Sequence, residues 1–469
     1  MSREGALVKN TAIIAIGKIC TQFVSFFLLP LYTGLLSTEE FGVVDLLNTL
    51  VSLLLPIITF QVEQAVFREL IELRGKEAEK TKIISSSFFS VCLQCFFYFL
   101  FFIAISPFIH NSYKIFLAVN VGASIFSSLF LQIARGIGNY SGYAAGSFFS
   151  ASSTIIFNVI FLVFMKLGVN GMMLGTFLGQ MTCILYLFFE LRLHQYLLPS
   201  RFSWVMVKKL WRYSVPLVPN AISWWVFNAS DRLIVSLMLG LSSNGILSAA
   251  SKFSGLYIGA YNIFNISWTE SVSLHIGDKD AENFFNQMLG RVLSLFLGMA
   301  AGIIACMPFV FPVMVNREYW SGYGLVPILM LASVCNVVVG LVSTVYVAKK
   351  NTRAIANTSI VSAIVNVVAH LLLIRICGLY AAAFSTLISF GVMSIYRTHD
   401  INKRYLKIKI NKRLVIKTMI VFTVVLPAYY VNQIYLNFFS LLIAAFYAWN
   451  INRNSLGFIL KALKSKVGR

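Results

Sequence analysis

The hydrophobic positions of this chain form long runs that are separated by short polar segments. A membrane-spanning helix needs roughly 20 apolar residues, and fourteen runs approach or exceed that length. They cover residues 11–36, 42–67, 83–106, 114–134, 143–165, 169–189, 213–238, 246–271, 291–315, 324–348, 355–374, 378–396, 414–431 and 435–451. The pattern predicts an all-α polytopic membrane protein with fourteen transmembrane helices. Twelve is the alternative if the last two runs, which are the shortest, lie in the membrane interface.

The Lys and Arg residues predict the orientation of these helices. Of the 38, 30 fall on the side that holds both chain ends, and four fall on the opposite side. The remaining four lie inside the predicted spans: Lys18, Arg232, Lys252 and Lys417. Because basic loops stay on the cytoplasmic side, we expect both termini to be cytoplasmic. The alternation of charge also supports an even number of spans independently of hydropathy.

The overall composition excludes a water-soluble enzyme. Hydrophobic residues make up 58% of the chain and charged residues only 12%, whereas a soluble domain has about 25% charged residues. The net charge of +21 is explained by the cytoplasmic loops, so the sequence predicts no nucleic-acid partner. It also contains no P-loop motif, and we expect no metal or other cofactor. The short loops predicted on the outer side disfavour a catalytic domain there.

A weak internal repeat predicts how the helices are grouped. The pattern Asn158, Lys166, Gly171 recurs about 208 residues later as Asn366, Arg375, Gly378. Paired repeats of helices are common in transporters, so we expect six-helix bundles over residues 1–196 and 197–400. An extra transmembrane pair would follow over 401–451. Residues 452–469 are predicted to form a basic, amphipathic cytoplasmic tail.

Several charged residues fall within the predicted spans, where each costs about 3 kcal/mol even on lenient insertion scales. One interpretation is that Lys18, Arg232 and Lys252 line a cationic cavity for an anionic ligand. The alternative is structural: Asp231 pairs with Lys252, while Lys18 and Glu63 extend to the inner interface. The isolated His370 is interpreted as a satisfied core residue.

The residues around the predicted seventh span resemble a known family. The segments 213–225 and 228–232, with Pro216, Pro219 and the Asp231–Arg232 pair, resemble the Wzx-type polysaccharide-unit flippases. Further matching residues are Lys9, Asn10, Gly17, Lys18, Leu29 to Thr33, Glu40 to Gly42, Asp45, Ala65 to Arg68, Lys252, Phe253, Trp268 and Glu270. The resemblance covers most of the first 400 residues.

The resemblance implies membership of the multidrug/oligosaccharidyl-lipid/polysaccharide exporter superfamily. It implies two six-helix bundles around a central cavity, with alternating access. Its implied substrate is undecaprenyl-pyrophosphate carrying an oligosaccharide repeat unit. The count of fourteen helices is similar to that of the peptidoglycan-precursor flippases of this superfamily, in which the extra pair forms a groove for the lipid tail.

We therefore predict a flippase of the bacterial cytoplasmic (inner) membrane that moves such units to the outer leaflet, for O-antigen or capsular polysaccharide. A polysaccharide polymerase and a chain-length regulator are the implied protein partners. The alternatives are a multidrug cation antiporter of the same superfamily and a membrane glycosyltransferase or polymerase. The predicted substrate-binding residues are Lys18, Arg68, Arg232 and Lys252. The carboxylates expected to tune these cations or to couple an ion are Asp45, Glu63, Asp231 and Glu270.

Overall fold

The structure is a computed structural model that describes residues 26–73, 77–108, 112–349, 351–409 and 411–467. Within these ranges it also describes the side chains, except those of residues 228, 266, 267, 270, 274, 352 and 454–467. The described residues form helices joined by short connections, without a β-strand among them. The predicted all-α class is therefore confirmed.

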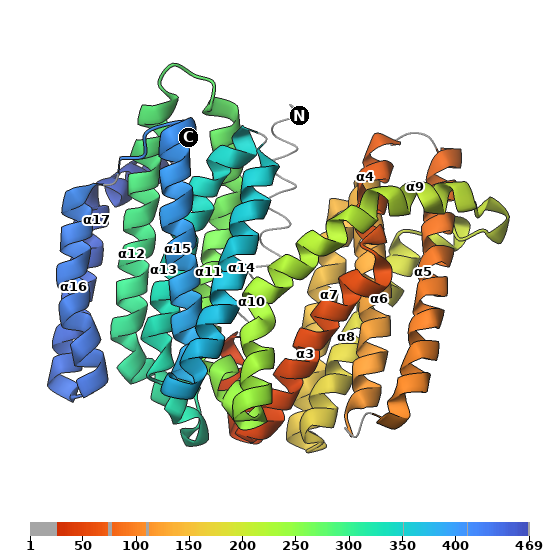
Figure 1. The fold of residues 1–469 in the computed structure, drawn as a ribbon, viewed down its shortest axis with the longest axis horizontal. Coiled ribbons are helices and arrows are strands. Elements are labelled where there is room, and N and C mark those ends of the chain that lie inside the picture. The colour runs from red at the N-terminus through yellow and green to blue at the C-terminus, as the bar shows by residue number, and fades with distance from the viewer. Residues whose placement is uncertain (1–25, 74–76, 109–111, 350, 410, 468–469) are drawn as a thin grey trace. The chain divides into compact units, whose positions relative to one another are not determined.

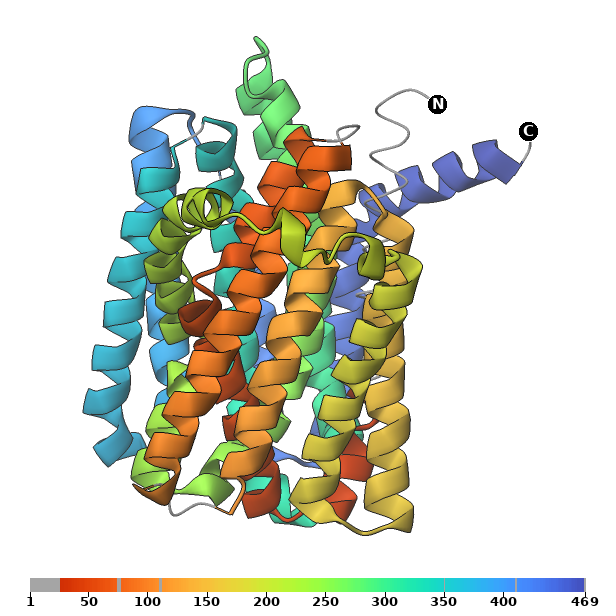
Figure 2. The ribbon, with the colours of Figure 1, turned by 90° about the vertical axis from the view of Figure 1, so that its right-hand side faces the viewer.

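The chain divides into two compact units, Met1–Gly245 and Ile246–Arg469. The first unit is drawn in red to yellow-green in Figure 1. Its α-helices are α2 (Leu29–Leu35), α3 (Thr38–Thr59), α4 (Val62–Glu72), α5 (Glu77–Ile105), α6 (Lys114–Ile137), α7 (Tyr140–Val159), α8 (Gly168–Glu190), α9 (Trp204–Ser214) and α10 (Val218–Leu239). Figure 2 shows α5 to α8 running side by side.

The second unit contains the remaining helices, drawn in green to blue in Figure 1. They are α11 (Leu241–His275), whose first turn belongs to the first unit, α12 (Ala281–Met314), α13 (Leu325–Ala348), α14 (Thr352–Cys377), α15 (Tyr380–Arg404), α16 (Lys412–Val431) and α17 (Ile434–Val467). Helix α15 packs against α13 and α14, and α17 packs against α12 and α16. The C-terminal pair is thus an integral part of this unit.

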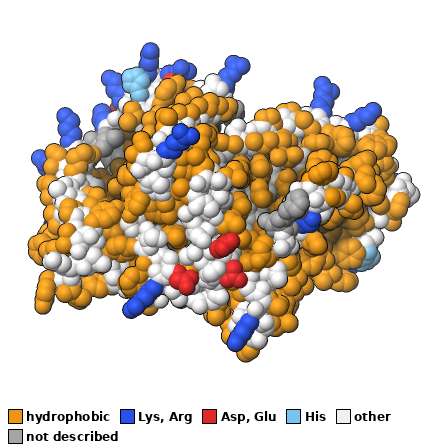
Figure 3. Space-filling model, turned by 60° about the horizontal axis from the view of Figure 1, so that its bottom comes forward, with side chains coloured by type: hydrophobic (Ala, Val, Ile, Leu, Met, Phe, Trp, Pro, Cys, Tyr) orange, Lys and Arg blue, Asp and Glu red, His pale blue; other side chains and the backbone are white. Residues whose placement is uncertain are grey.

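Ten helices in the described part of the chain are long and apolar enough to cross a membrane. Three further predicted spans coincide with α10, α11 and α15, which have 22, 35 and 25 residues but are more polar. Most of the first predicted span lies outside the described residues. Large apolar side chains are exposed on the spanning helices, for example Phe96 on α5, at 62%. In Figure 3 hydrophobic side chains cover much of the visible surface, and Lys and Arg project mainly at its upper edge.

Two predicted helices have different boundaries in the structure. The run 42–67 is not one helix, because Phe60 and Gln61 both adopt the left-handed conformation and separate α3 from α4. The run 213–238 becomes helix α10 only at Val218, because Pro216 lies in a 3₁₀ turn and Pro219 in the first turn of α10. Proline fits that first turn because the missing N–H has no partner there.

The repeated asparagines occupy similar places in the two units. Asn158 is buried on α7, and a Cβ atom at Gly175 of α8 would lie 2.1 Å from its Oδ1 atom. Asn366 is buried on α14, where its amide contacts the Ser389 hydroxyl of α15 at 3.4 Å. Each asparagine therefore faces the second helix of a hairpin. The compact units divide at 245/246, whereas the predicted bundles divide at 196/197.

Candidate functional site

Two of the predicted site charges of the first unit, Arg232 and Asp45, meet where α10 runs beside α3. The Nε atom of Arg232 lies 3.0 Å from Oδ2 of Asp45. The Asn244 side-chain amide donates to the carbonyl of Gly42 at 3.0 Å and to the Asp45 carboxylate at 3.4 Å. The arginine side chain is 32% exposed and the aspartate 13%. The pair is therefore neutralised but still accessible at the arginine.

Close backbone packing sets the position of this ion pair. A Cβ atom at Gly42 would lie 1.9 Å from the carbonyl oxygen of Leu241, and one at Gly245 would lie 1.9 Å from that of Thr38. Real Cβ atoms do not approach so closely, so both positions require glycine. The two contacts are reciprocal, because Leu241 lies one helical turn before Gly245 and Thr38 lies one turn before Gly42. They hold the first turn of α11 against the start of α3, and this brings Asn244 to Asp45.

The start of α3 is itself well defined. The Ser37 hydroxyl accepts from the backbone N–H of Glu40 at 3.2 Å, and the Glu40 carboxylate accepts from the N–H of Ser37 at 2.9 Å. This capping box satisfies two N–H groups that the helix cannot pair internally. Asp45 therefore projects from a helix whose first turn is fixed.

The other predicted site residues are dispersed. Arg68 is 58% exposed, pairs with Glu72 at 3.7 Å and lies over the Tyr213 ring at 5.3 Å. Glu63 is buried at the start of α4, and Asp231 is half-buried on α10. Lys252 is half-buried on α11 in the second unit. Lys18 and the Glu270 side chain lie outside the described residues.

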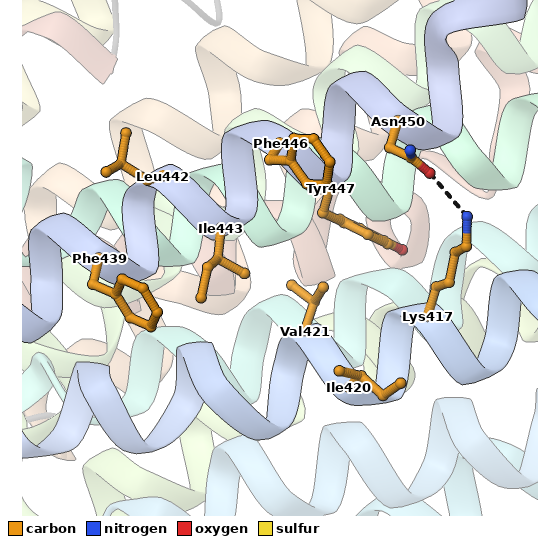
Figure 4. A pocket seen from close by; sticks show the side chains of 9 residues that line it. All are labelled: Lys417, Ile420, Val421, Phe439, Leu442, Ile443, Phe446, Tyr447 and Asn450. Carbon is orange, nitrogen blue, oxygen red and sulfur yellow. Dashed lines mark hydrogen bonds between the residues drawn. The ribbon is translucent and has the colours of Figure 1, made fainter.

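A groove runs between α16 and α17 in the second unit, with a volume of about 510 Å³ (Figure 4). Apolar and aromatic side chains line its length. They are Ile420, Val421, Phe439, Leu442, Ile443, Phe446 and Tyr447. At one end the Lys417 ammonium donates to the Asn450 side-chain carbonyl at 2.9 Å. Apolar side chains thus line the groove along its length, and one cation, Lys417, lines its end.

A second, polar pocket of about 350 Å³ lies at the same end of this helix pair. Its lining includes Arg291 and Lys409, together with Asn286 and Asn411. Asn286 binds the backbone of the loop that precedes α16. Its side-chain amide donates to the Lys407 carbonyl oxygen at 2.8 Å, and its side-chain carbonyl accepts from the Lys409 N–H at 2.7 Å. Lys409 also pairs with Glu282 at 3.3 Å. The chemistry of this pocket suits an anion.

The roles of two cations, Lys417 and Arg397, do not follow from the sequence alone. Lys417 was identified within the span 414–431, but its position at the end of a groove depends on how α16 meets α17. Arg397 directly follows the predicted span 378–396, on the side of the basic loops, yet it is only 2% exposed on α15. A charged residue directly after an apolar run is an ambiguous signal, because a helix that extends beyond the run can bury it.

The described residues offer no group of three or more His, Cys, Asp or Glu side chains that could hold a metal ion. Comparison with family profiles then identifies the chain. The profile described as "polysaccharide biosynthesis protein" matches residues 7–268, which is more than half of the sequence. The chain belongs to the polysaccharide biosynthesis protein family. This confirms the family resemblance predicted from the residues of the seventh span.

Solved structures with the same fold are transporters and flippases. The structure of the lipid II flippase MurJ in an inward closed conformation matches with a TM-score of 0.70 at 16% identity, covering 97% of this chain and 100% of that one. An inward-facing multidrug resistance MATE family transporter matches with a TM-score of 0.69 at 12% identity. That match covers 83% of this chain and 98% of the transporter.

At such low identities these likenesses establish the fold. Curated protein sequences gave no match. This member of the polysaccharide biosynthesis family therefore shares its helical architecture with a lipid flippase and a multidrug transporter.

Proposed function

We propose that the protein is a flippase for undecaprenyl-pyrophosphate-linked oligosaccharide repeat units. It moves them from the inner to the outer leaflet of the bacterial cytoplasmic membrane by alternating access, for O-antigen or capsular polysaccharide assembly. Both chain ends are then cytoplasmic, and a polymerase and a chain-length regulator act with it. The observation that carries the proposal is the apolar groove between α16 and α17 with Lys417 at its end.

The groove suits a lipid tail better than a small drug. It is open to the surrounding bilayer, because Ile420, Leu442 and Phe446 are 61%, 69% and 65% exposed. An isoprenoid that leaves the membrane for this groove gains no hydrophobic free energy, since lipid tails are as apolar as leucine side chains. The groove therefore contributes shape and position. Affinity must come from the polar part of the lipid.

The cations at the end of the groove can supply that affinity. A positive and a negative charge 4 Å apart attract by about 4 kcal/mol at an effective dielectric constant of 20. Lys417 is positioned to meet the first phosphate of a tail lying in the groove, and Arg291 and Lys409 line the neighbouring polar pocket. Arginine and lysine both bind phosphate oxygens well. A diphosphate can thus be received at this end.

The remaining predicted residues act further along the path. Lys18, Arg68, Arg232 and Lys252 successively attract the diphosphate and acidic sugars. Asp45 holds Arg232 until the cargo replaces it, because both anions bind the same exposed guanidinium. Asp231, Glu63 and Glu270 tune these cations or couple an ion. With the cytoplasm negative, each negative charge that moves outward gains about 2.3 kcal/mol per 100 mV.

The alternative is a multidrug cation antiporter, which the MATE-like fold favours. The extra helix pair argues against it. The MurJ match covers about 66 more residues of this chain than the MATE match does, judged from 97% and 83% of 469 residues. Helices α16 and α17 have 20 and 34 residues, so this difference is large enough to contain both. A groove ending in a lysine also repels organic cations.

The test is complementation of a strain that lacks the gene, with lipid-linked repeat units as the readout. We expect single units to accumulate in the cytoplasmic leaflet of the deletion strain, shielded in spheroplasts from a membrane-impermeant sugar oxidant. Wild-type protein restores export, whereas Lys417→Gln lowers it about tenfold, equivalent to 1.4 kcal/mol. The matched control is Arg353→Gln, an exposed cation of the same unit outside the groove lining.

Three outcomes contradict the proposal. Units that reach the outer leaflet of the deletion strain would mean that the protein acts after translocation. Equal export by the Lys417 and Arg353 variants would exclude the groove. Broad resistance to organic cations on overexpression, with unchanged polysaccharide in the deletion strain, would favour the antiporter.

A further inference from the structure

The segment that joins α8 to α10 carries cations but no acidic side chain. Between Glu190 and Asp231 the sequence contains no Asp or Glu. The basic residues there are Arg192, Arg201, Lys208, Lys209 and Arg212. In the described part of the chain only Lys209 of these pairs with a carboxylate, that of Glu69 at 2.5 Å. The segment is therefore rich in positive charge that the protein itself does not neutralise.

Helix α9 in this segment has two unlike faces. One face is buried in the contact with α4 and α5, and its residues are Val207, Leu210 and Ser214. The opposite face is exposed and carries Val205, Lys208 and Arg212, with Val205 at 79%. Both sets have the spacing i, i+3, i+7, which places their members on one side of a helix. The exposed face therefore combines an apolar side chain with two cations.

The two cations on this face, Lys208 and Arg212, are neighbours one helical turn apart. Like charges at i and i+4 weaken a helix, and α9 has no acidic residue in its first turn to compensate. Lys209, the next cation on this side of the helix, is already engaged by Glu69. An anion from outside the chain relieves the repulsion between Lys208 and Arg212. The exposed face therefore suits an anionic partner.

Buried serines on α5 fix the level at which this segment lies. The backbone N–H of Leu198 donates to the Ser85 hydroxyl at 3.1 Å, and that of Ser203 donates to the Ser86 hydroxyl at 3.1 Å. Both serines are fully buried and stand near the start of the apolar run 83–106. Figure 1 shows α9 lying across α4 and α5, near their upper ends. The segment is therefore held at the edge of the apolar part of α5, which is the level of lipid headgroups.

Exposed apolar side chains lie in the same segment as these cations. Leu198 is 39% exposed, and Trp204, the first residue of α9, is 49% exposed. Tryptophan is enriched at membrane–water interfaces, and helices that carry basic and apolar side chains lie in the plane of the interface. A soluble anion accounts for Lys208 and Arg212 but not for the exposed apolar groups. An anionic phospholipid accounts for both.

We propose that helix α9, Trp204–Ser214, is a binding surface for anionic phospholipids. Lys208 and Arg212 bind the lipid phosphates, while Trp204 and Val205 contact the glycerol and the upper part of the acyl chains. These lipids stay in the bilayer and are distinct from the cargo; under the proposed orientation they belong to the cytoplasmic leaflet. Each basic residue near an anionic surface strengthens association roughly fivefold. Two such residues therefore favour anionic over zwitterionic lipid by about tenfold or more.

The test is quenching of Trp204 fluorescence by brominated lipids, with the whole protein in proteoliposomes. The difference between wild type and Trp204→Phe isolates this emission from that of the other tryptophans. We expect brominated phosphatidylglycerol to associate about tenfold more strongly than brominated phosphatidylcholine. Lys208→Gln combined with Arg212→Gln removes this preference. The matched control, Arg353→Gln combined with Lys403→Gln, removes two exposed cations of the second unit and retains the preference.

The salt dependence of the wild type keeps the test decisive even if a variant folds poorly. Raising the ionic strength from about 0.01 M to about 1 M shortens the Debye length from about 30 Å to about 3 Å, so the lipid preference should disappear. Trp204 emission that neither lipid quenches would overturn the proposal in favour of an aqueous partner. Equal association of both lipids at low salt, or an equal loss in the control variant, would also overturn it. Export of lipid-linked units is measured separately, so this proposal and the flippase assignment can fail independently.

Discussion

Two arginines, Arg232 in the first unit and Arg397 in the second, show how differently this protein uses a charge at a helix contact. Arg232 is 32% exposed and has a carboxylate partner, Asp45. Arg397 is 2% exposed, and in the described part of the chain its guanidinium bonds only to neutral groups. Its Nε donates to Thr358 at 2.9 Å and its Nη2 to Ser359 at 3.0 Å.

The second arginine is a structural clamp. Its other bonds reach the Ser343 hydroxyl of α13 and the Ile355 carbonyl of α14, so one side chain of α15 ties three helices together. Burying a charge costs several kcal/mol, and bonds to a charged donor return about 1.5–3 kcal/mol each. Four of its five N–H donors are engaged in these bonds, and the side chain is buried, so it is not available to a ligand. Arg232, in contrast, keeps exposed surface and can exchange one anion for another.

The strongest test of this contrast removes the clamp. Arg397→Ala should lower the free energy of unfolding by about 3 kcal/mol or more, because it leaves a cavity and breaks four hydrogen bonds. The measurement is thermal unfolding of the purified protein in detergent. Arg404→Ala is the control on the same helix, since Arg404 is 58% exposed and pairs with Asp400. Exposed pairs contribute at most about 1 kcal/mol. Equal melting temperatures for the two variants would refute the clamp.

A second test asks what holds the Arg232 region in place. Gly42→Ala should destabilise the protein by about 2 kcal/mol, because the added methyl group collides with the Leu241 carbonyl and overpacking costs about 1–3 kcal/mol. The control is Gly34→Ala, which places its methyl group in open space. The same unfolding measurement applies. If both alanine variants are equally stable, glycine packing does not position Asp45.

The smallest expected effect on stability is that of Arg232 itself. Arg232→Gln should change the free energy of unfolding by less than about 1 kcal/mol, while surface polysaccharide falls at least tenfold at equal protein level. The reason is that the partly exposed guanidinium contributes to cargo binding more than to folding. Asp45→Asn is the matched change, and it should retain more export than Arg232→Gln because the cation remains. A severe folding defect in Arg232→Gln would show that Arg232 is structural, as Arg397 is. Full export by this variant would show that Arg232 does not bind the cargo.

Several features of the site were predictable from single residues. Intramembrane charges stood out against apolar runs, and the spacing of those runs predicted the helices that carry Asp45 and Arg232. The residues of the seventh span predicted the family, which the profile match confirms. These inferences succeed because the length and hydropathy of a segment are local properties.

Other features depended on which helix faces meet. Nothing in the sequence marks the break at Phe60 and Gln61, because neither glycine nor proline stands at those positions. Pro308 and Pro312 lie inside the ninth predicted span, where proline commonly kinks or breaks a helix, yet α12 continues through both. Kinks and breaks depend on how the freed backbone groups are satisfied by neighbouring helices. Such neighbours are known only from the fold.

The sequence by itself determined two properties of this protein. It is a helical membrane protein, because the free energy of transferring a segment into a bilayer is a sum over neighbouring residues. It belongs to a polysaccharide biosynthesis family, which the residues of the seventh span already indicate. The tertiary structure decided that Arg232 meets Asp45 across 187 positions, that Lys417 ends a groove, and that Arg397 is a clamp rather than a loop cation. Pairing and burial depend on packing between distant segments. Hydropathy is a sum over single residues, so it contains no information about which distant segments pack together.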